Sequence, residues 1–227
     1  MKENLTELIF ILDRSGSMAN MESEALNGFN SFLEEQKKLS GEANLTLVLF
    51  DHEYSLIYNG KNIREVEPLT KNIYSARGTT ALLDAVGRTV DDVGKRLAAM
   101  PESDRPGKVL VAILTDGLEN ASKDYQKKRI NEMLSHQKTK YSWEFMFLAA
   151  NQDAFAEGYN IGINMSKAMN FDMTSAGMAK SFGAMNASAK LYRSCARDVY
   201  ATTDINSLVD DQGKETQVVD NLLNNKS

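Results

Sequence analysis

The sequence predicts an α/β fold with a doubly wound, mostly parallel six-stranded sheet, helices on both faces and one antiparallel edge strand. Two observations predict this fold. Continuously apolar runs, such as residues 9–12 and 109–114, indicate strands that are buried on both faces, as in parallel sheets. Longer segments with the apolar spacing of helices alternate with these runs, which is the order of βαβ units.

The strands are expected where apolar runs lie between turn-forming residues. In chain order they cover residues 9–12, 44–50, 54–59, 108–115, 143–150 and 168–171. The run at 54–59 is short and directly follows its predecessor, which predicts a hairpin and therefore the antiparallel edge strand. The others are separated by helices and are expected to be parallel.

The helices are expected where apolar residues recur every three or four positions. They cover about residues 21–39, 82–100, 122–136, the surroundings of Phe155, and 174–199. Pro101 and the polar loop after it end the second helix. Ser122 is expected to cap the third. The last helix is rich in Ala, Ser and Gly, which allows either close packing against the sheet or a shift in position when a ligand binds.

A carboxylate and two hydroxyls stand at alternate positions directly after the first strand, at Asp13, Ser15 and Ser17. Gly16 allows the loop to turn tightly enough to aim both hydroxyls back toward the carboxylate. An all-oxygen set of low charge suits a hard divalent cation such as Mg²⁺. A strand end capped by turn-forming Asp and Ser is the alternative interpretation.

Two later segments favour the metal site. The strand at residues 108–115 also ends in an aspartate, Asp116, and the intervening loop carries Gly78, Thr79 and Thr80 into a helix. Together these segments resemble the von Willebrand factor A (vWA) family. Its metal-ion-dependent adhesion site combines Asp-x-Ser-x-Ser, a loop threonine and an aspartate that follows a later strand.

The resemblance implies a complete set of metal ligands in this chain: Asp13, Ser15, Ser17, Thr80 and Asp116. The family loop usually reads Gly-Gly-Thr, so Thr79 remains an alternative to Thr80. The implied cofactor is Mg²⁺, with Mn²⁺ or Ca²⁺ as alternatives. In a doubly wound sheet, these residues lie at the carboxyl ends of the strands, where the strand order reverses.

The resemblance further implies a protein-binding module in which an Asp or Glu of a partner completes the metal coordination. Stand-alone intracellular relatives of prokaryotic or phage type suggest an adaptor, for example beside an AAA+ ATPase or a stress-response component. Loops around the metal would set specificity. Candidates for these loops are residues 18–21, Glu119, Asn120 and residues 151–153, each of which also fits an ordinary cap or turn.

A Mg²⁺-dependent hydrolase or phosphatase with Asp13 as nucleophile is the main alternative function. Such enzymes typically carry a second acid two residues later, where this chain has Ser15. A serine hydrolase needs a histidine base, and the only histidines are His52 and His136. No glycine-rich phosphate loop is present. A structural scaffold with a vestigial metal site is a third possibility, which the full set of candidate ligands disfavours.

Composition narrows the partners and the compartment. Among 227 residues, 26 are Lys or Arg and 31 are Asp or Glu, so the formal charge of −5 argues against nucleic-acid or anionic-membrane partners. The single cysteine, Cys195, excludes an intrachain disulfide and a cysteine-based zinc site. The first residues do not resemble a secretory signal, so a cytoplasmic location is expected.

The chain is expected to form one vWA domain over residues 1–200, followed by a polar flexible tail over residues 201–227. Within the tail, residues 218–223 could form one short helix.

Overall fold

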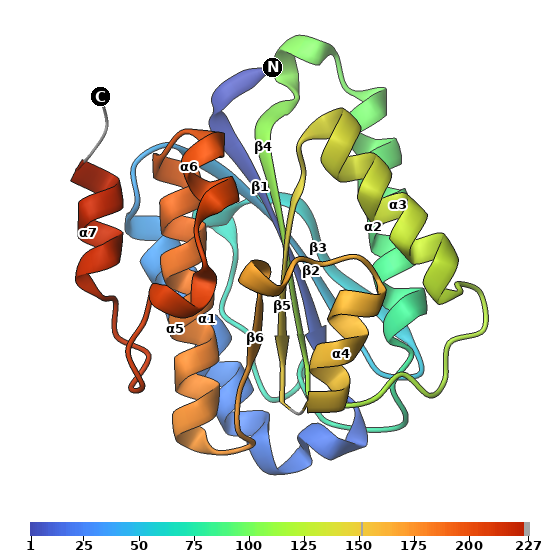
Figure 1. Ribbon diagram of the computed structural model, residues 1–227. Coiled ribbons are helices and arrows are strands. Elements are labelled where there is room, and N and C mark those ends of the chain that lie inside the picture. Colours follow the sequence, from blue (N-terminus) through green and yellow to red (C-terminus); the bar gives the residue numbers. More distant parts are fainter. Residues whose placement is uncertain (151, 225–227) are drawn as a thin grey trace.

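A six-stranded sheet forms the centre of the computed structural model, which describes residues 1–150 and 152–224 (Figure 1). The spatial order of its strands is β3-β2-β1-β4-β5-β6. Their bounds are β1 Lys2–Asp13, β2 Glu42–Phe50, β3 Tyr54–Asn62, β4 Pro106–Thr115, β5 Glu144–Ala149 and β6 Ala168–Asn170. All pairs are parallel except the antiparallel pair of β2 and β3 at one edge. The predicted fold class is therefore confirmed.

Helices cover both faces of this sheet (Figure 1). Their bounds are α1 Glu22–Lys38, α2 Leu82–Ala99, α3 Lys127–Tyr141, α4 Gln152–Asn160, α5 Ser175–Ser194, α6 Arg197–Thr202 and α7 Gln217–Asn224. Buried residues of α1 and α5 share one core with one face of the sheet. Buried residues of α2 and α3 share a second core with the other face. No helix among the described residues is long and apolar enough to cross a membrane.

The central strand β1 contributes side chains to both cores because successive side chains point to opposite faces of the sheet. Leu8, Phe10 and Leu12 belong to the core beneath α1 and α5, while Ile9 and Ile11 belong to the other. β1 pairs with β2 on one side and with β4 on the other, and the chain order reverses between these neighbours. The carboxyl ends of β1 and β4 therefore border the crevice where such sheets bind ligands.

The start of α3 differs from the prediction. The helix begins at Lys127, not at Ser122. The hydroxyl of Ser122 instead accepts a hydrogen bond from the backbone N–H of Asp84, in the first turn of α2. Ser122 was predicted to cap α3, but its hydroxyl instead binds a backbone N–H at the start of α2, which lies earlier in the chain.

The short helix predicted at residues 218–223 is present as α7. The segment after Ala201 otherwise differs from the flexible tail that its polarity predicts, because the side chains of Ile205, Leu208 and Val219 are fully buried in the core around α5. The segment has few apolar residues, but those that it has pack into the same core as α5. The division of the chain at residue 200 stays a prediction.

Close packing of α5 is achieved through glycines on its neighbours and on the helix itself. A Cβ atom at Gly28 of α1 would overlap the ring of Phe182, and one at Gly183 would overlap the backbone of Gly213. The small side chains of this helix thus permit close contact. A shift of α5 upon ligand binding stays a prediction.

Candidate metal site

Asp13 ends β1 and is fully buried, with hydrogen bonds to both carboxylate oxygens. Oδ1 accepts the backbone N–H of Ser15 at 2.6 Å, and Oδ2 accepts the hydroxyl of Thr115, the last residue of β4, at 2.5 Å. The first bond turns the loop back on itself immediately after the strand. The second joins the ends of the two neighbouring strands.

Ser17 connects the two loops that follow β1 and β4. Its hydroxyl donates to Oδ1 of Asp116 at 2.8 Å and lies 3.1 Å from the hydroxyl oxygen of Ser15. Asp13, Ser15, Ser17 and Asp116 therefore lie together, although the last is about a hundred residues away in the sequence. The turn that Gly16 was predicted to allow brings these groups to one place.

Thr80 and Thr79 differ clearly in position. Thr80 is 3% exposed and Thr79 is exposed. A Cβ atom built on Gly117 would lie 2.7 Å from Oγ1 of Thr80, so this hydroxyl lies against the backbone directly after Asp116. The backbone N–H of Thr80 also donates to Oδ1 of Asn120, which anchors the threonine loop to the loop after β4. Of the two threonines, Thr80 lies beside the other candidate ligands.

Burial disfavours the ionised form of both carboxylates at the site, Asp13 and Asp116. Burial raises the pKa of Asp13 to about 6, with a further increase from Asp116, although hydrogen bonds from Thr115 and Ser15 oppose the shift. Burial also raises the pKa of Asp116. No lysine or arginine of the described residues forms an ion pair with Asp13. A divalent cation would offset this cost, and the oxygen-only donor set suits such an ion.

Sequence analysis did not identify Asp51 as part of the site. Its buried carboxylate accepts hydrogen bonds from Nε of Arg14 and from Nε of Arg77, each at 2.9 Å. The backbone N–H of Arg77 donates to the carbonyl of Arg14, and that of Gly16 to the carbonyl of Gly78. Asp51 thus holds the serine loop and the threonine loop together. Its partners are 37 and 26 residues away in the sequence, so no local pattern could reveal this role.

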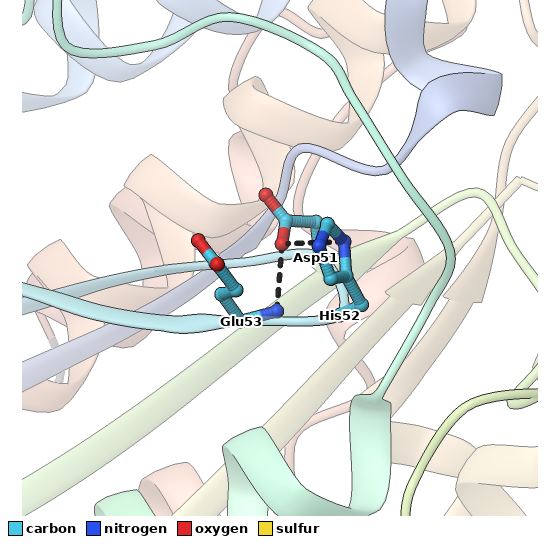
Figure 2. Close-up of side chains that lie close together, drawn as sticks. All are labelled: Asp51, His52 and Glu53. Carbon is cyan, nitrogen blue, oxygen red and sulfur yellow. Dashed lines mark hydrogen bonds and ion pairs between the residues drawn. The ribbon is translucent and has the colours of Figure 1, made fainter.

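Asp51, His52 and Glu53 form a cluster next to these loops (Figure 2). Nδ1 of His52 lies 3.2 Å from Oδ1 of Asp51, and the same oxygen accepts the backbone N–H of Glu53 at 2.7 Å. The other oxygen of Asp51 is occupied by two guanidinium groups, so the cluster is already neutralised by the protein itself. Neither His52 nor His136 forms a hydrogen bond with Ser15 or Ser17 among the described residues.

Several residues that were considered for the rim of the site have structural roles. Glu119 accepts the backbone N–H of Leu83 at 2.8 Å and the hydroxyl of Ser122 at 2.6 Å, so it caps α2. Met18 is fully buried. Of the segment 151–153, Asn151 and the side chains of the next two residues lie outside the described part of the structure.

The sequence matches no protein-family model and no curated protein. Solved structures do match the overall architecture. The vWA protein of the bacterium Catenulispora acidiphila superposes with a TM-score of 0.54 at 15% identity, over 83% of this chain and 43% of that chain. The fold is that of a von Willebrand factor A domain.

Two further solved structures extend the comparison. Proximal thread matrix protein 1 from mussel byssus, solved with a zinc-occupied MIDAS motif, gives a TM-score of 0.58 at 16% identity, over 84% of this chain and 47% of that one. The pilus adhesin SpaC of Lactobacillus rhamnosus GG gives 0.62 at 13% identity, over 84% and 30%. This chain spans less than half the length of these proteins, and the similarity concerns the vWA fold alone.

Proposed function

We propose that Asp13, Ser15, Ser17, Thr80 and Asp116 bind Mg²⁺, with Mn²⁺ or Ca²⁺ as alternatives, and that an acidic side chain of a partner protein completes the coordination. The observation that carries this proposal is the position of the Ser17 hydroxyl. It contacts both the other serine and Asp116, and so joins donors from two strands at one point.

The composition of this donor set favours binding of an anionic partner group. Three of the five groups are neutral hydroxyls, which coordinate a cation without cancelling its charge, so the two carboxylates leave no net negative charge that would repel an acidic partner group. Mg²⁺ demands six ligands and keeps waters where the protein supplies few donors. A partner carboxylate could replace one of these waters and form a charge-assisted contact that fixes orientation.

The geometry fits catalysis by Asp13 less well. Both of its carboxylate oxygens accept hydrogen bonds from the protein, one from a backbone N–H and one from a hydroxyl. These bonds hold the carboxylate in a fixed orientation and reduce its nucleophilicity. We therefore propose a binding module and not a Mg²⁺-dependent hydrolase.

The proposal includes a cytoplasmic adaptor role, with a partner such as an AAA+ ATPase or a stress-response component. The net charge of −5 supports a protein partner over nucleic acid or an anionic membrane. One structurally similar protein has zinc in its MIDAS motif, and another is a pilus adhesin. Binding to a protein through a metal is thus compatible with this fold.

Isothermal titration calorimetry with Mg²⁺ and Mn²⁺ tests the metal site. Thr80→Val keeps the size of the side chain and removes the hydroxyl, and we expect metal affinity to fall by roughly tenfold or more, as for other groups that support metal sites. Thr79→Val is the matched control and should bind metal like the wild type, because Thr79 is exposed. Loss of affinity in Thr79→Val alone would mean that Thr79 is the ligand.

A second experiment tests the partner. The wild type and Asp13→Ala are used to capture proteins from a native lysate in Mg²⁺ and in EDTA. A protein retained only by the wild type in Mg²⁺ is the expected outcome. A partner that is retained equally in all four conditions would contradict binding through the metal, even if calorimetry confirms the metal site.

A further inference from the structure

A cavity lies at the opposite end of the sheet from the candidate metal site. It has a volume of about 300 Å³ and is lined by the first residues of β4, the ends of α2 and α3, the connection to β5 and the first residue of α6. β4 runs from this cavity, at Pro106, to the candidate metal site, after Thr115. The two sites are therefore separate, and the size of the cavity is that of a small ligand site.

The inner surface of this cavity is apolar. Leu97, Val109 and Trp143 line it and are each less than a tenth exposed. The Trp143 ring also packs against Phe145.

Three cationic side chains line the cavity. Arg105, Lys140 and Arg197 lie there beside the neutral polar residues Gln137 and Ser142, and none of the described lining residues is acidic, although the chain as a whole carries a formal charge of −5. Hydrogen bonds hold two of the cations in place. Arg105 donates from Nε to the carbonyl of Met100 at 3.0 Å, and Arg197 donates to the carbonyl of Gly107.

We propose that this cavity binds a small amphipathic carboxylate, with its apolar chain beside Trp143 and its carboxylate among the cations. The apolar lining would shield the chain from water, and each guanidinium retains N–H donors beyond those that bind backbone carbonyls. Arginines that are already oriented lose little freedom when they bind an anion. The proposal does not depend on the metal site.

Trp143 is the only tryptophan of the chain, so its fluorescence reports on this cavity directly. Octanoate is the probe, titrated below the concentration at which it forms micelles, with octylammonium and octan-1-ol as matched probes. We expect octanoate to shift the emission saturably with a Kd of about 1 mM or tighter, which is reasonable for a ligand of this size. Octanol should bind more weakly, and octylammonium should not bind at all.

Two variants test the mode of binding. Lys140→Gln should weaken octanoate binding by about three- to tenfold and leave octanol binding unchanged, because it removes one partly solvated charge. Ala98→Leu should weaken both, because Ala98 lines the cavity and is exposed enough to be replaced without unfolding α2. Lys128→Gln, on the same helix as Lys140 but outside the cavity, is the control and should bind octanoate like the wild type.

Equal binding of octanoate and octanol would overturn the proposal, as would equal binding of octanoate to Lys140→Gln and the wild type. The absence of a saturable shift below about 10 mM octanoate would overturn it as well. Circular dichroism of each variant separates a loss of binding from a loss of folding.

Discussion

At the scale of single residues, Asp13 is the group whose burial has the largest predictable consequence. Its pKa of about 6 lies above the ordinary value of 3.8, mainly because of desolvation. The folded state therefore binds a proton more tightly than the unfolded state between these two pH values. The contribution of Asp13 to stability is fully present below about pH 4 and is lost as the pH rises through about 6.

We expect Asp13→Asn to remove this pH dependence in the metal-free protein. The asparagine keeps an oxygen for the N–H of Ser15 and cannot ionise. Two pKa units correspond to about 3 kcal/mol, so the free energy of unfolding of the wild type should fall by up to that amount, relative to the variant, between about pH 4 and 7. Urea denaturation in EDTA at several pH values measures the difference.

Saturating Mg²⁺ provides the internal control for this prediction. It should stabilise the wild type at pH 7 and leave Asp13→Asn unchanged, because the ion binds only the folded site with an ionised ligand. Parallel stability curves of the two proteins in EDTA would show that burial of Asp13 has no electrostatic cost.

Asp51 is a residue whose loss should affect both stability and the candidate metal site. Asp51→Asn leaves the guanidinium of Arg14, whose side chain is 9% exposed, without its buried counter-charge. We expect a loss of about 3 kcal/mol in the free energy of unfolding and a weaker affinity for Mg²⁺ in calorimetry, since the serine and threonine loops are no longer tied together.

Glu53→Gln is the matched control for Asp51→Asn. Glu53 also pairs with Arg77, but its side chain is 57% exposed, so its removal should change stability by less than about 0.5 kcal/mol. Normal metal affinity in Asp51→Asn would contradict the role of Asp51 in positioning the two loops.

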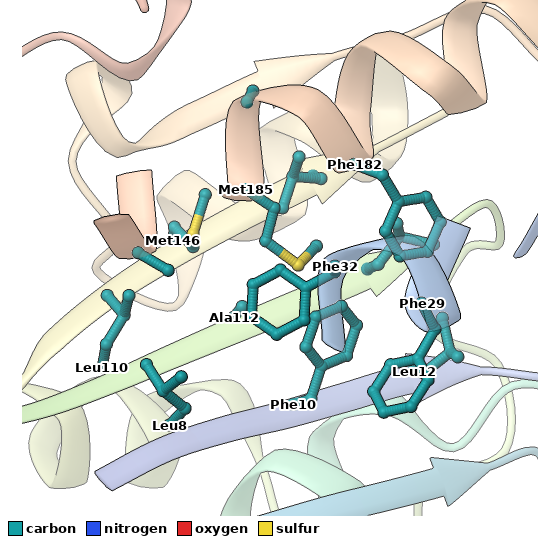
Figure 3. Close-up of a cluster of buried hydrophobic side chains, with 14 of the residues drawn as sticks. Leu8, Phe10, Leu12, Phe29, Phe32, Leu110, Ala112, Met146, Phe182 and Met185 are labelled. Atoms are coloured by element: carbon teal, nitrogen blue, oxygen red, sulfur yellow. The ribbon is translucent and has the colours of Figure 1, made fainter. Parts of the chain in front are cut away.

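At the scale of elements, two glycines in helix interiors should respond to the same substitution with opposite sign. Figure 3 shows Phe182 of α5 in the core, where its ring stacks with that of Phe10 at 6.1 Å between centroids, and Gly28 of α1 provides the space for the Phe182 ring. Gly28→Ala should reduce the free energy of unfolding by about 1–3 kcal/mol because the ring must move. Thermal and urea denaturation measure the change.

Gly94→Ala in α2 is the comparison. A Cβ atom there would lie 3.5 Å from its nearest neighbour, the amide nitrogen of Gln137, which is an ordinary contact. The substitution should stabilise the protein by about 0.5–1 kcal/mol through helix propensity alone. Destabilisation by both substitutions to the same degree would show that the packing of α1 against α5 is not the cause.

The helices also show which local sequence signals are sufficient to predict where a helix begins or ends. The second helix ends as predicted, at Ala99 before Pro101, because proline acts on its immediate neighbours. The predicted N-cap of α3, Ser122, lies four residues before the observed one, Gln126, because Ser122 and Glu119 satisfy the N-terminus of α2 instead. A capping residue can be identified in a sequence, but the helix that it caps depends on the tertiary structure.

At the scale of the whole molecule, local sequence patterns predicted the sheet but not the contacts between the loops at its end. Apolar runs between turn-forming residues predicted the central strands, and the short connection between β2 and β3 predicted their antiparallel pairing at the edge. The position of Thr80 beside Gly117 and the pairing of Asp51 with two arginines depend on residues far apart in the chain. Those contacts follow from topology and packing, which local patterns do not encode.

Two adjacent valines test whether the C-terminal segment packs against the rest of the molecule or forms a flexible tail. Val219 is fully buried against the core around α5, and Val218 is 37% exposed on the same helix, α7. Val219→Ala should reduce the free energy of unfolding by about 1–2 kcal/mol, because it removes buried methyl groups and leaves a small cavity. Val218→Ala should change it by less than about 0.5 kcal/mol. Both substitutions change helix propensity equally, so a difference in urea denaturation reports burial alone. Equal stability of the two variants would instead support the flexible tail that the polarity of the segment predicts.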